Sequence, residues 1–157
     1  MAVDVGAKAP DFTLHNQDRQ EVTLSEELKK GPVVLAFMPA AFSSVCTTEM
    51  CTFRDSTAEL DKFNATVLGI TVDTFFALGA WRNAENLGVT LLSYFNKDVI
   101  RAYGVVNPDM IGLKDIAKRS IFVIDKNGIV RYKEVLEDAR NEPDYEKVFS
   151  ALASLAA

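Results

Sequence analysis

The chain has 157 residues, of which 48% are hydrophobic and 25% are charged, and its formal net charge is −5. This length suits a single domain, residues 1–157, with a hydrophobic core of its own, and the negative charge argues against a nucleic-acid-binding protein. No apolar run approaches the roughly 20 residues of a membrane span, and the chain does not open with the basic and apolar regions of a signal peptide. We therefore expect a cytoplasmic protein that does not enter the membrane.

The first third of the chain predicts a hairpin, one helical turn and a buried strand. Residues 8–14 and 21–24 favour extended structure around a short turn. Ser25 is a candidate N-cap for a helical turn, which Gly31 and the proline after it then end. Residues 33–38 are an uninterrupted apolar run, which predicts a buried central strand.

A cysteine follows this strand where a helix is predicted to begin. Pro39 ends the strand, Ser43 and Ser44 are candidate caps, and residues 52–64 are compatible with a helix. Cys46 therefore lies near a helix N-terminus, whose unpaired N–H groups and partial positive charge favour the reactive thiolate. We interpret Cys46 as a candidate nucleophile, the alternative being a buried structural cysteine.

The helix that follows carries a second cysteine on a different side. An inward face is predicted by residues spaced three and four apart. These are Cys46, Met50, Phe53, Thr57 and Leu60. Cys51 lies on a more polar side, and five residues along a helix separate two Cα atoms by roughly 8 Å, too far for a disulfide. A bridge between the two cysteines would require the first turns to unwind.

The middle of the chain predicts parallel strands joined by a helix. Residues 66–72 are a second apolar strand, and a helix is predicted over 75–87 with Gly88 as its C-terminal cap. A strand–helix–strand order implies a parallel pair with a crossover. Residues 91–95 are short and extended, and 97–103 predict a short helix.

The last third predicts a loop, a hairpin and a final helix. The loop over 105–118 is long, which often marks function. Strands are predicted at 119–125 and 129–135, and the Asn127-Gly128 pair between them is a strong hairpin signal. A final helix is predicted over 142–155. Together these elements predict an α/β, thioredoxin-like fold with a central mixed sheet flanked by helices and an N-terminal hairpin.

The segment around Cys46 resembles a known family. Pro39-x-x-x-Ser43-x-x-Cys46 is similar to the signature of the peroxiredoxins, the cysteine-dependent peroxidases, and Glu49 matches a common family position. Cys51, five residues after Cys46, resembles the resolving cysteine of the peroxiredoxin Q (bacterioferritin-comigratory) group, with some likeness to one-cysteine alkyl hydroperoxide reductase E. The other matching residues are Thr71-Val72-Asp73-Thr74, Phe76, Trp81 and Arg119. The resemblance covers nearly the whole chain.

This resemblance implies roles for the candidate site residues. The Cys46 thiolate would attack a peroxide and become a sulfenic acid. Arg119 would stabilise both the thiolate and the expelled alkoxide or hydroxide, although it could instead be a surface charge. Ser43 would donate to the peroxide, and Pro39 would shield the thiolate from water. Glu49 either orients the arginine or merely favours the helix N-terminus.

The resemblance also implies a fate for the sulfenic acid. Cys51 would attack it to form a disulfide that a thioredoxin- or glutaredoxin-like donor reduces. In the alternative, Cys51 is inert and the protein is a one-cysteine peroxidase. Two other classes stay open: a dithiol oxidoreductase, which is expected to use C-x-x-C rather than the four-residue separation present here, and a non-catalytic redox-sensing module.

No cofactor and no metal are predicted. Two cysteines and one distant histidine, His15, suit neither a zinc site nor a Cys–His catalytic pair, and no glycine-rich phosphate loop is present. The chain is expected to be a monomer or a homodimer. Four large aromatic residues near the expected site could form a dimer interface of the kind seen in the family, or belong to the core. They are Phe42, Phe75, Phe76 and Trp81.

Overall fold

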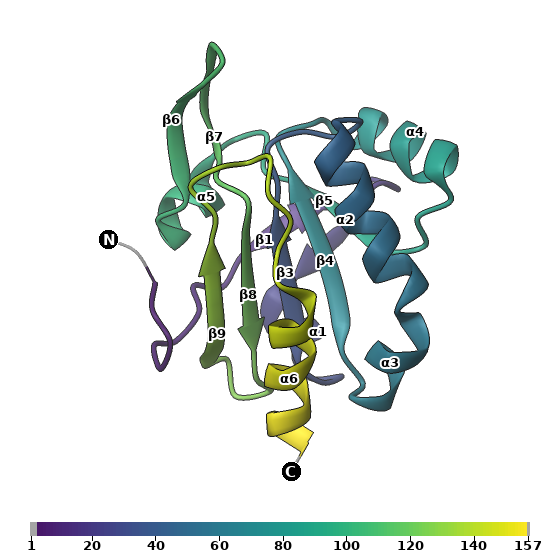
Figure 1. Cartoon of the computed structure of the whole chain (residues 1–157), viewed down its shortest axis with the longest axis vertical. Helices are drawn as coiled ribbons and strands as arrows, with labels where there is room; N and C mark the ends of the chain where they lie inside the picture. Colours follow the sequence, from purple (N-terminus) through teal and green to yellow (C-terminus); the bar gives the residue numbers. More distant parts are fainter. Residues whose placement is uncertain (1–2, 157) are drawn as a thin grey trace.

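A five-stranded mixed sheet forms the centre of the molecule in this computed structural model, which describes residues 3–156 (Figure 1). Its strands are β3 (Val33–Phe37), β4 (Thr66–Thr71), β5 (Thr90–Ser93), β8 (Ser120–Ile124) and β9 (Val130–Val135). They lie in the order β5-β4-β3-β8-β9. β3, β4 and β5 run parallel, whereas β8 runs antiparallel to β3 and β9. The predicted parallel strands and the predicted hairpin thus share one sheet.

Helices cover both faces of this sheet. On one face are α2 (Ser44–Asp55), α3 (Thr57–Lys62), α4 (Phe75–Glu85) and α6 (Tyr145–Ala156); on the other are α1 (Leu24–Glu27) and α5 (Asp98–Tyr103). Each face has its own core cluster. β3 contributes to both, because successive strand residues point to opposite faces: Leu35 packs in one cluster and Ala36 in the other. The apolar run of β3 is therefore explained by burial on two sides.

Two small hairpins lie outside the sheet. The predicted N-terminal hairpin is present as β1 (Thr13–His15) and β2 (Glu21–Thr23). The second, β6 (Val106–Met110) with β7 (Leu113–Ala117), projects beyond the sheet in Figure 1, where a long irregular loop was predicted. Its two turn residues, Ile111 and Gly112, have φ of 47° and 92°, which suits a tight hairpin turn. The prediction failed because isoleucine rarely adopts positive φ.

Two predicted helix boundaries are wrong. The chain breaks at Ser56, which has φ −101° and ψ 15°, so α2 and α3 are separate helices. Thr57 is consequently exposed rather than on the inward face, whereas Leu60 is buried. α4 ends earlier than predicted, because Asn86 with φ 50° takes the left-handed cap conformation that was assigned to Gly88.

The segment before β3 combines one wrong prediction and one confirmed one. Ser25 does not cap the helical turn: α1 already begins at Leu24, and the Ser25 N–H donates to Asp11 Oδ1 at 2.9 Å. Gly31 does end this segment. It has φ 153°, and a Cβ there would lie 2.2 Å from the Asn64 carbonyl oxygen, so only glycine fits.

Within residues 3–156, no helix has both the length and the apolar character needed to cross a bilayer.

Candidate active site

Cys46 lies in the first turn of α2, just beyond the carboxyl end of β3. Ser43 is the N-cap residue, so the Cys46 amide is the third of the helix. The Cys46 side chain is completely buried and packs in the core cluster under α2. Phe42, in the preceding loop, has φ 65°, a conformation that costs a non-glycine residue free energy and is often found at functional sites. The predicted placement of Cys46 at a strand-to-helix junction is confirmed.

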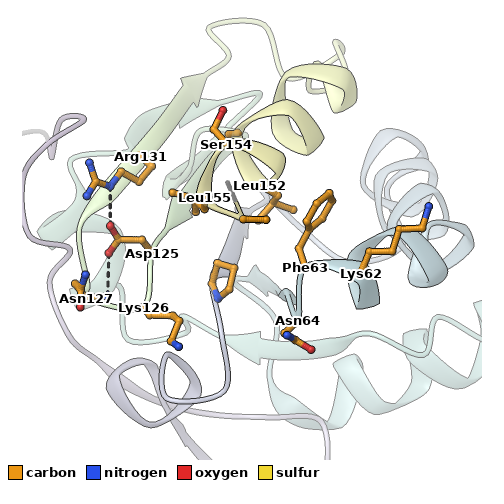
Figure 2. Close-up of a pocket in the computed structure, with 13 residues that line it drawn as sticks. Lys62, Phe63, Asn64, Asp125, Lys126, Asn127, Arg131, Leu152, Ser154 and Leu155 are labelled. Carbon is orange, nitrogen blue, oxygen red and sulfur yellow. Dashed lines mark hydrogen bonds and ion pairs between the residues drawn. The ribbon is translucent and has the colours of Figure 1, made fainter.

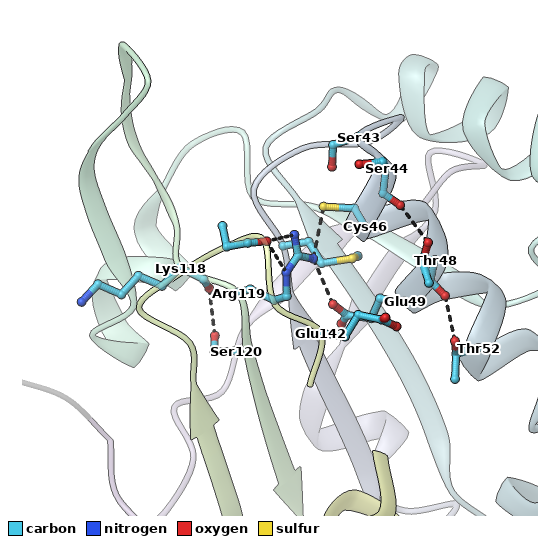
Figure 3. A network of polar contacts seen from close by, with 12 residues as sticks. Ser43, Ser44, Cys46, Thr48, Glu49, Thr52, Lys118, Arg119, Ser120 and Glu142 are labelled. Carbon is cyan, nitrogen blue, oxygen red and sulfur yellow. Dashed lines mark hydrogen bonds and ion pairs between the residues drawn. The ribbon is translucent and has the colours of Figure 1, made fainter. Parts of the chain in front are cut away.

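Arg119 brings a guanidinium to the Cys46 sulfur (Figure 3). Its Nη1 lies 3.3 Å from Cys46 Sγ and 3.0 Å from Glu49 Oε1. Its Nε and Nη2 donate to the Ala139 carbonyl at 3.2 and 2.9 Å, which fixes the plane of the group. Only 2% of the side chain is exposed, so Arg119 is not the surface charge of the alternative interpretation. Burial lowers the pKa of Arg119, but the charges of Cys46 and Glu49 outweigh this and raise it, so the group stays a cation.

Glu49 is a buried carboxyl with only one of its oxygens bonded. Oε1 accepts from Arg119, whereas Oε2 has no hydrogen-bond partner among residues 3–156. Burial raises the pKa of Glu49 from 4.5 to about 7; Arg119 opposes this rise, and the charges of Glu142 and Glu134 add to it. The helix dipole acts most strongly in the first turn of α2, and Glu49 lies beyond that turn. The geometry thus favours an interaction with the arginine over a purely helix-stabilising role.

Ser43 and Pro39 belong to the segment between β3 and α2, and within residues 3–156 the Ser43 hydroxyl makes no hydrogen bond to Cys46. Ser43 is the N-cap residue, yet its hydroxyl makes no capping bond and donates instead to the Ala40 carbonyl at 3.0 Å. The expectation that this side chain caps the helix is therefore wrong, and Ser44 lies inside the helix. Ser43 is exposed, whereas Pro39 is buried.

Cys51 is a free thiol, as is Cys46. It is partly buried and packs against the same core cluster as Cys46. Both cysteines belong to the intact helix α2, in which a five-residue separation places their Cα atoms roughly 8 Å apart, beyond disulfide reach.

Three residues from distant parts of the chain hold the segment around Cys46. Asp73 accepts from the Ala41 N–H at 2.6 Å, and Trp81 donates to the Thr47 hydroxyl at 3.2 Å. The hydroxyl of Tyr94 lies 3.1 and 3.2 Å from the carbonyl oxygens of the two residues that follow β3. The first two belong to the stretch noted from the sequence. Tyr94 carries no motif, and sequence reasoning missed it.

A cavity of about 710 Å³ lies elsewhere in the molecule, among the end of α3, the β8–β9 turn and α6 (Figure 2). Its charged lining includes Lys62, Lys126 and Arg131, the last paired with Asp125 at 2.6 Å. Neither this cavity nor two others of about 350 and 310 Å³ is lined by Cys46. The Cys46 sulfur is therefore covered by neighbouring residues. Within residues 3–156, no three side chains gather as metal ligands would.

Comparison with known sequences identifies similar proteins. A sequence model of the AhpC/TSA family matches residues 5–133. The chain is 36% identical over 141 residues to the 2-Cys peroxiredoxin BAS1 of Hordeum vulgare, covering 83% of this chain and 65% of that protein. It is 35% identical over 157 residues to alkyl hydroperoxide reductase E of Mycobacterium bovis, covering 99% of both. Across four chloroplastic relatives, the chain spans between 52% and 82% of their length.

A solved structure supports the same grouping. Peroxidoxin BcpB from Mycobacterium tuberculosis superimposes with a TM-score of 0.88 at 29% identity, covering 99% of both chains. This agreement confirms the predicted thioredoxin-like fold.

The pKa of Glu49 predicts an unusual pH dependence of stability. Between pH 4.5 and 7 the folded protein retains a proton that the unfolded chain releases, so the free energy of unfolding should fall as pH rises through this range, by up to about 3 kcal/mol. Glu49→Gln keeps an acceptor for Arg119 but cannot ionise. Urea unfolding at pH 5 and pH 8 should therefore show the variant gaining stability relative to wild type at the higher pH. An equal difference at both pH values would contradict the assignment.

Proposed function

Because the chain belongs to the AhpC/TSA family of peroxiredoxins, we propose that it is a thiol-dependent peroxidase with Cys46 as its peroxidatic residue. The observation that carries this proposal is the 3.3 Å contact between Arg119 Nη1 and Cys46 Sγ in a buried site. A cation at this distance favours the thiolate over the thiol. It also stabilises negative charge that develops next to the sulfur.

In the proposed reaction, the Cys46 thiolate attacks the terminal oxygen of a hydroperoxide, ROOH. The S–O bond forms as the O–O bond breaks, which leaves Cys46 as a sulfenic acid and expels an alkoxide that takes up a proton to become ROH. Hydrogen peroxide and organic hydroperoxides both fit this scheme. Arg119 uses four of its five N–H groups in the contacts described above, so one N–H of Nη2 is available for the substrate oxygens.

Ser43 and Pro39 are proposed to form the entrance to the sulfur. Among residues 3–156, the carbonyl of Ala40 in the same loop is the one partner of the Ser43 hydroxyl, so rotation can turn this hydroxyl toward an incoming peroxide. The Pro39 ring carries no polar atom and its nitrogen has no hydrogen to donate, so this side chain keeps water away from the sulfur. Because Cys46 has no exposed surface, we propose that the loop over residues 40–43 opens to admit the substrate.

We propose that Cys51 resolves the sulfenic acid. Its attack on Cys46 would release water and form a disulfide, which a thioredoxin- or glutaredoxin-like dithiol would reduce. Support comes from the position of Cys46 in the first turn of α2, where few intrahelical hydrogen bonds must break for the two sulfurs to meet. If Cys51 is inert, the protein is a one-cysteine peroxidase. The cytoplasm, where thiols are kept reduced, is the compartment that suits either cycle.

We propose that residues 1–157 act as one domain, because both core clusters pack on the two faces of one sheet. Trp81, one of the aromatic residues considered for an interface, is completely buried, whereas Phe42 and Phe76 are 55% and 70% exposed. Exposed aromatic rings near the site favour a homodimer over a monomer.

Cys46→Ser tests the proposed nucleophile. The variant should fold with a circular dichroism spectrum like that of wild type and consume no peroxide, because the serine hydroxyl is far less acidic than the thiol. Peroxide loss is followed with thioredoxin and its reductase. Near wild-type turnover by this variant would remove the central assignment.

Arg119→Ala tests the proposed electrostatic role. We expect the reaction with peroxide to slow by about 100-fold, and alkylation of Cys46 by iodoacetamide at pH 7 to slow as well. Arg82→Ala is a matched control, since Arg82 also donates to backbone carbonyls, those of Val89 and Gly88, without contacting Cys46. Equal rates for the two variants would mean that Arg119 has no specific role.

Cys51→Ser tests resolution. Intact mass after one equivalent of peroxide should show the loss of two hydrogen atoms in wild type and an added oxygen in the variant. The variant should then over-oxidise readily and fail to turn over with thioredoxin. In wild type, amides from Cys46 to Arg54 should lose hydrogen-exchange protection on oxidation. Normal turnover by the variant would establish the one-cysteine cycle instead.

A further inference from the structure

Tyr94 makes an unusual set of contacts immediately after β5. Its side chain is 1% exposed and lies in the core cluster opposite α2. The hydroxyl accepts from the Ala117 N–H at 2.8 Å and lies 3.1 and 3.2 Å from the carbonyl oxygens of Met38 and Pro39. A phenol has one O–H donor and can also accept, so one buried oxygen joins backbone groups of two separate segments.

These two segments are the ones that carry the candidate site. The last register pair between β3 and β8 is Phe37 with Ser120. Beyond this pair the two segments separate. One segment runs through Met38 and Pro39 towards Cys46. The other runs from Ala117, at the end of β7, to Arg119. No strand ladder joins them there, and the Tyr94 hydroxyl bridges the gap.

From this geometry we propose that Tyr94 is a positioning residue, which sets the separation between the Cys46 segment and the Arg119 segment. Its hydroxyl makes its hydrogen bonds to backbone atoms of both segments, and none of them is to the Cys46 or Arg119 side chain. Its own place is fixed, because its N–H donates to the Thr71 carbonyl at 2.7 Å and its carbonyl accepts from the Lys97 N–H at 2.7 Å. The catalytic consequence rests on the proposed peroxidase function.

The hydroxyl must keep its proton for this arrangement to persist. Burial raises the pKa of Tyr94, the N–H of Ala117 opposes this, and the charges of Asp73 and Cys46 raise it further. Tyr94 is therefore a neutral donor throughout the working pH range, and its hydroxyl keeps the proton that it donates to the carbonyl oxygens.

The test is Tyr94→Phe with Tyr103→Phe as its matched control. Tyr103 is a completely buried ring in the same core cluster, and its hydroxyl donates to the Pro10 carbonyl at 2.7 Å, away from Cys46. Each variant loses one oxygen and keeps its ring. Thermal unfolding of both variants measures the structural cost, and stopped-flow oxidation by hydrogen peroxide measures the effect on Cys46.

We expect Tyr94→Phe to slow the peroxide reaction about tenfold or more, because small displacements of reacting groups are costly, whereas Tyr103→Phe keeps the wild-type rate. The pH profile of Cys46 alkylation by iodoacetamide should also shift in Tyr94→Phe only. Should both variants keep the wild-type rate and profile, Tyr94 only packs in the core. If wild type itself fails to reduce peroxide, the proposed function is wrong, yet the alkylation profiles still test the positioning role.

A measurement on the wild-type chain covers the case in which Tyr94→Phe does not fold. The Ala117 amide should exchange with solvent deuterium as slowly as the amides of β8, because its acceptor is a buried phenol oxygen. Fast exchange at Ala117 would show that the bridge does not persist in solution and would overturn the proposal.

Discussion

A buried guanidinium is unfavourable unless anionic groups and hydrogen bonds meet it, and Arg119 satisfies this requirement with the residues that make the candidate site. Its Nη1 lies between Cys46 Sγ and Glu49 Oε1, and the Ala139 carbonyl holds the rest of the group. Because Glu49 is held partly protonated near neutral pH by burial, the arginine charge is not fully neutralised by it. The remaining positive charge of Arg119 can then stabilise negative charge on the Cys46 sulfur, which lies 3.3 Å from Nη1.

The fold brings these residues together through one pair of strands. β3 leads into the Cys46 loop and β8 follows directly after Arg119, and the two strands are antiparallel neighbours in the centre of the sheet. Cys46 and Arg119 thus meet at one sheet end although 73 residues separate them in sequence. Where the ladder ends, side chains from other strands and loops hold the diverging segments, Asp73 on the Ala41 amide and Tyr94 on the backbone of both.

Much of this arrangement could be predicted from the sequence, because its signals are local. The apolar run of β3, the proline before Cys46 and the Asn-Gly turn between β8 and β9 each act on neighbouring residues. The failures have non-local or atypical causes. Ser56 breaks the helix without glycine or proline, Ile111 adopts a positive φ that its side chain disfavours, and the role of Tyr94 depends on backbone groups 23 and 56 residues away. No pattern of residue types in the sequence predicts such contacts.

The central proposal is that the 3.3 Å contact with Arg119 makes Cys46 reactive towards peroxide. The most direct test is the second-order rate constant of reduced wild-type protein with hydrogen peroxide, measured by stopped flow beside free cysteine at the same pH. We expect a rate constant orders of magnitude above that of free cysteine, with one equivalent of peroxide consumed per Cys46. A rate constant equal to that of free cysteine would contradict it and would leave Cys46 an ordinary buried thiol.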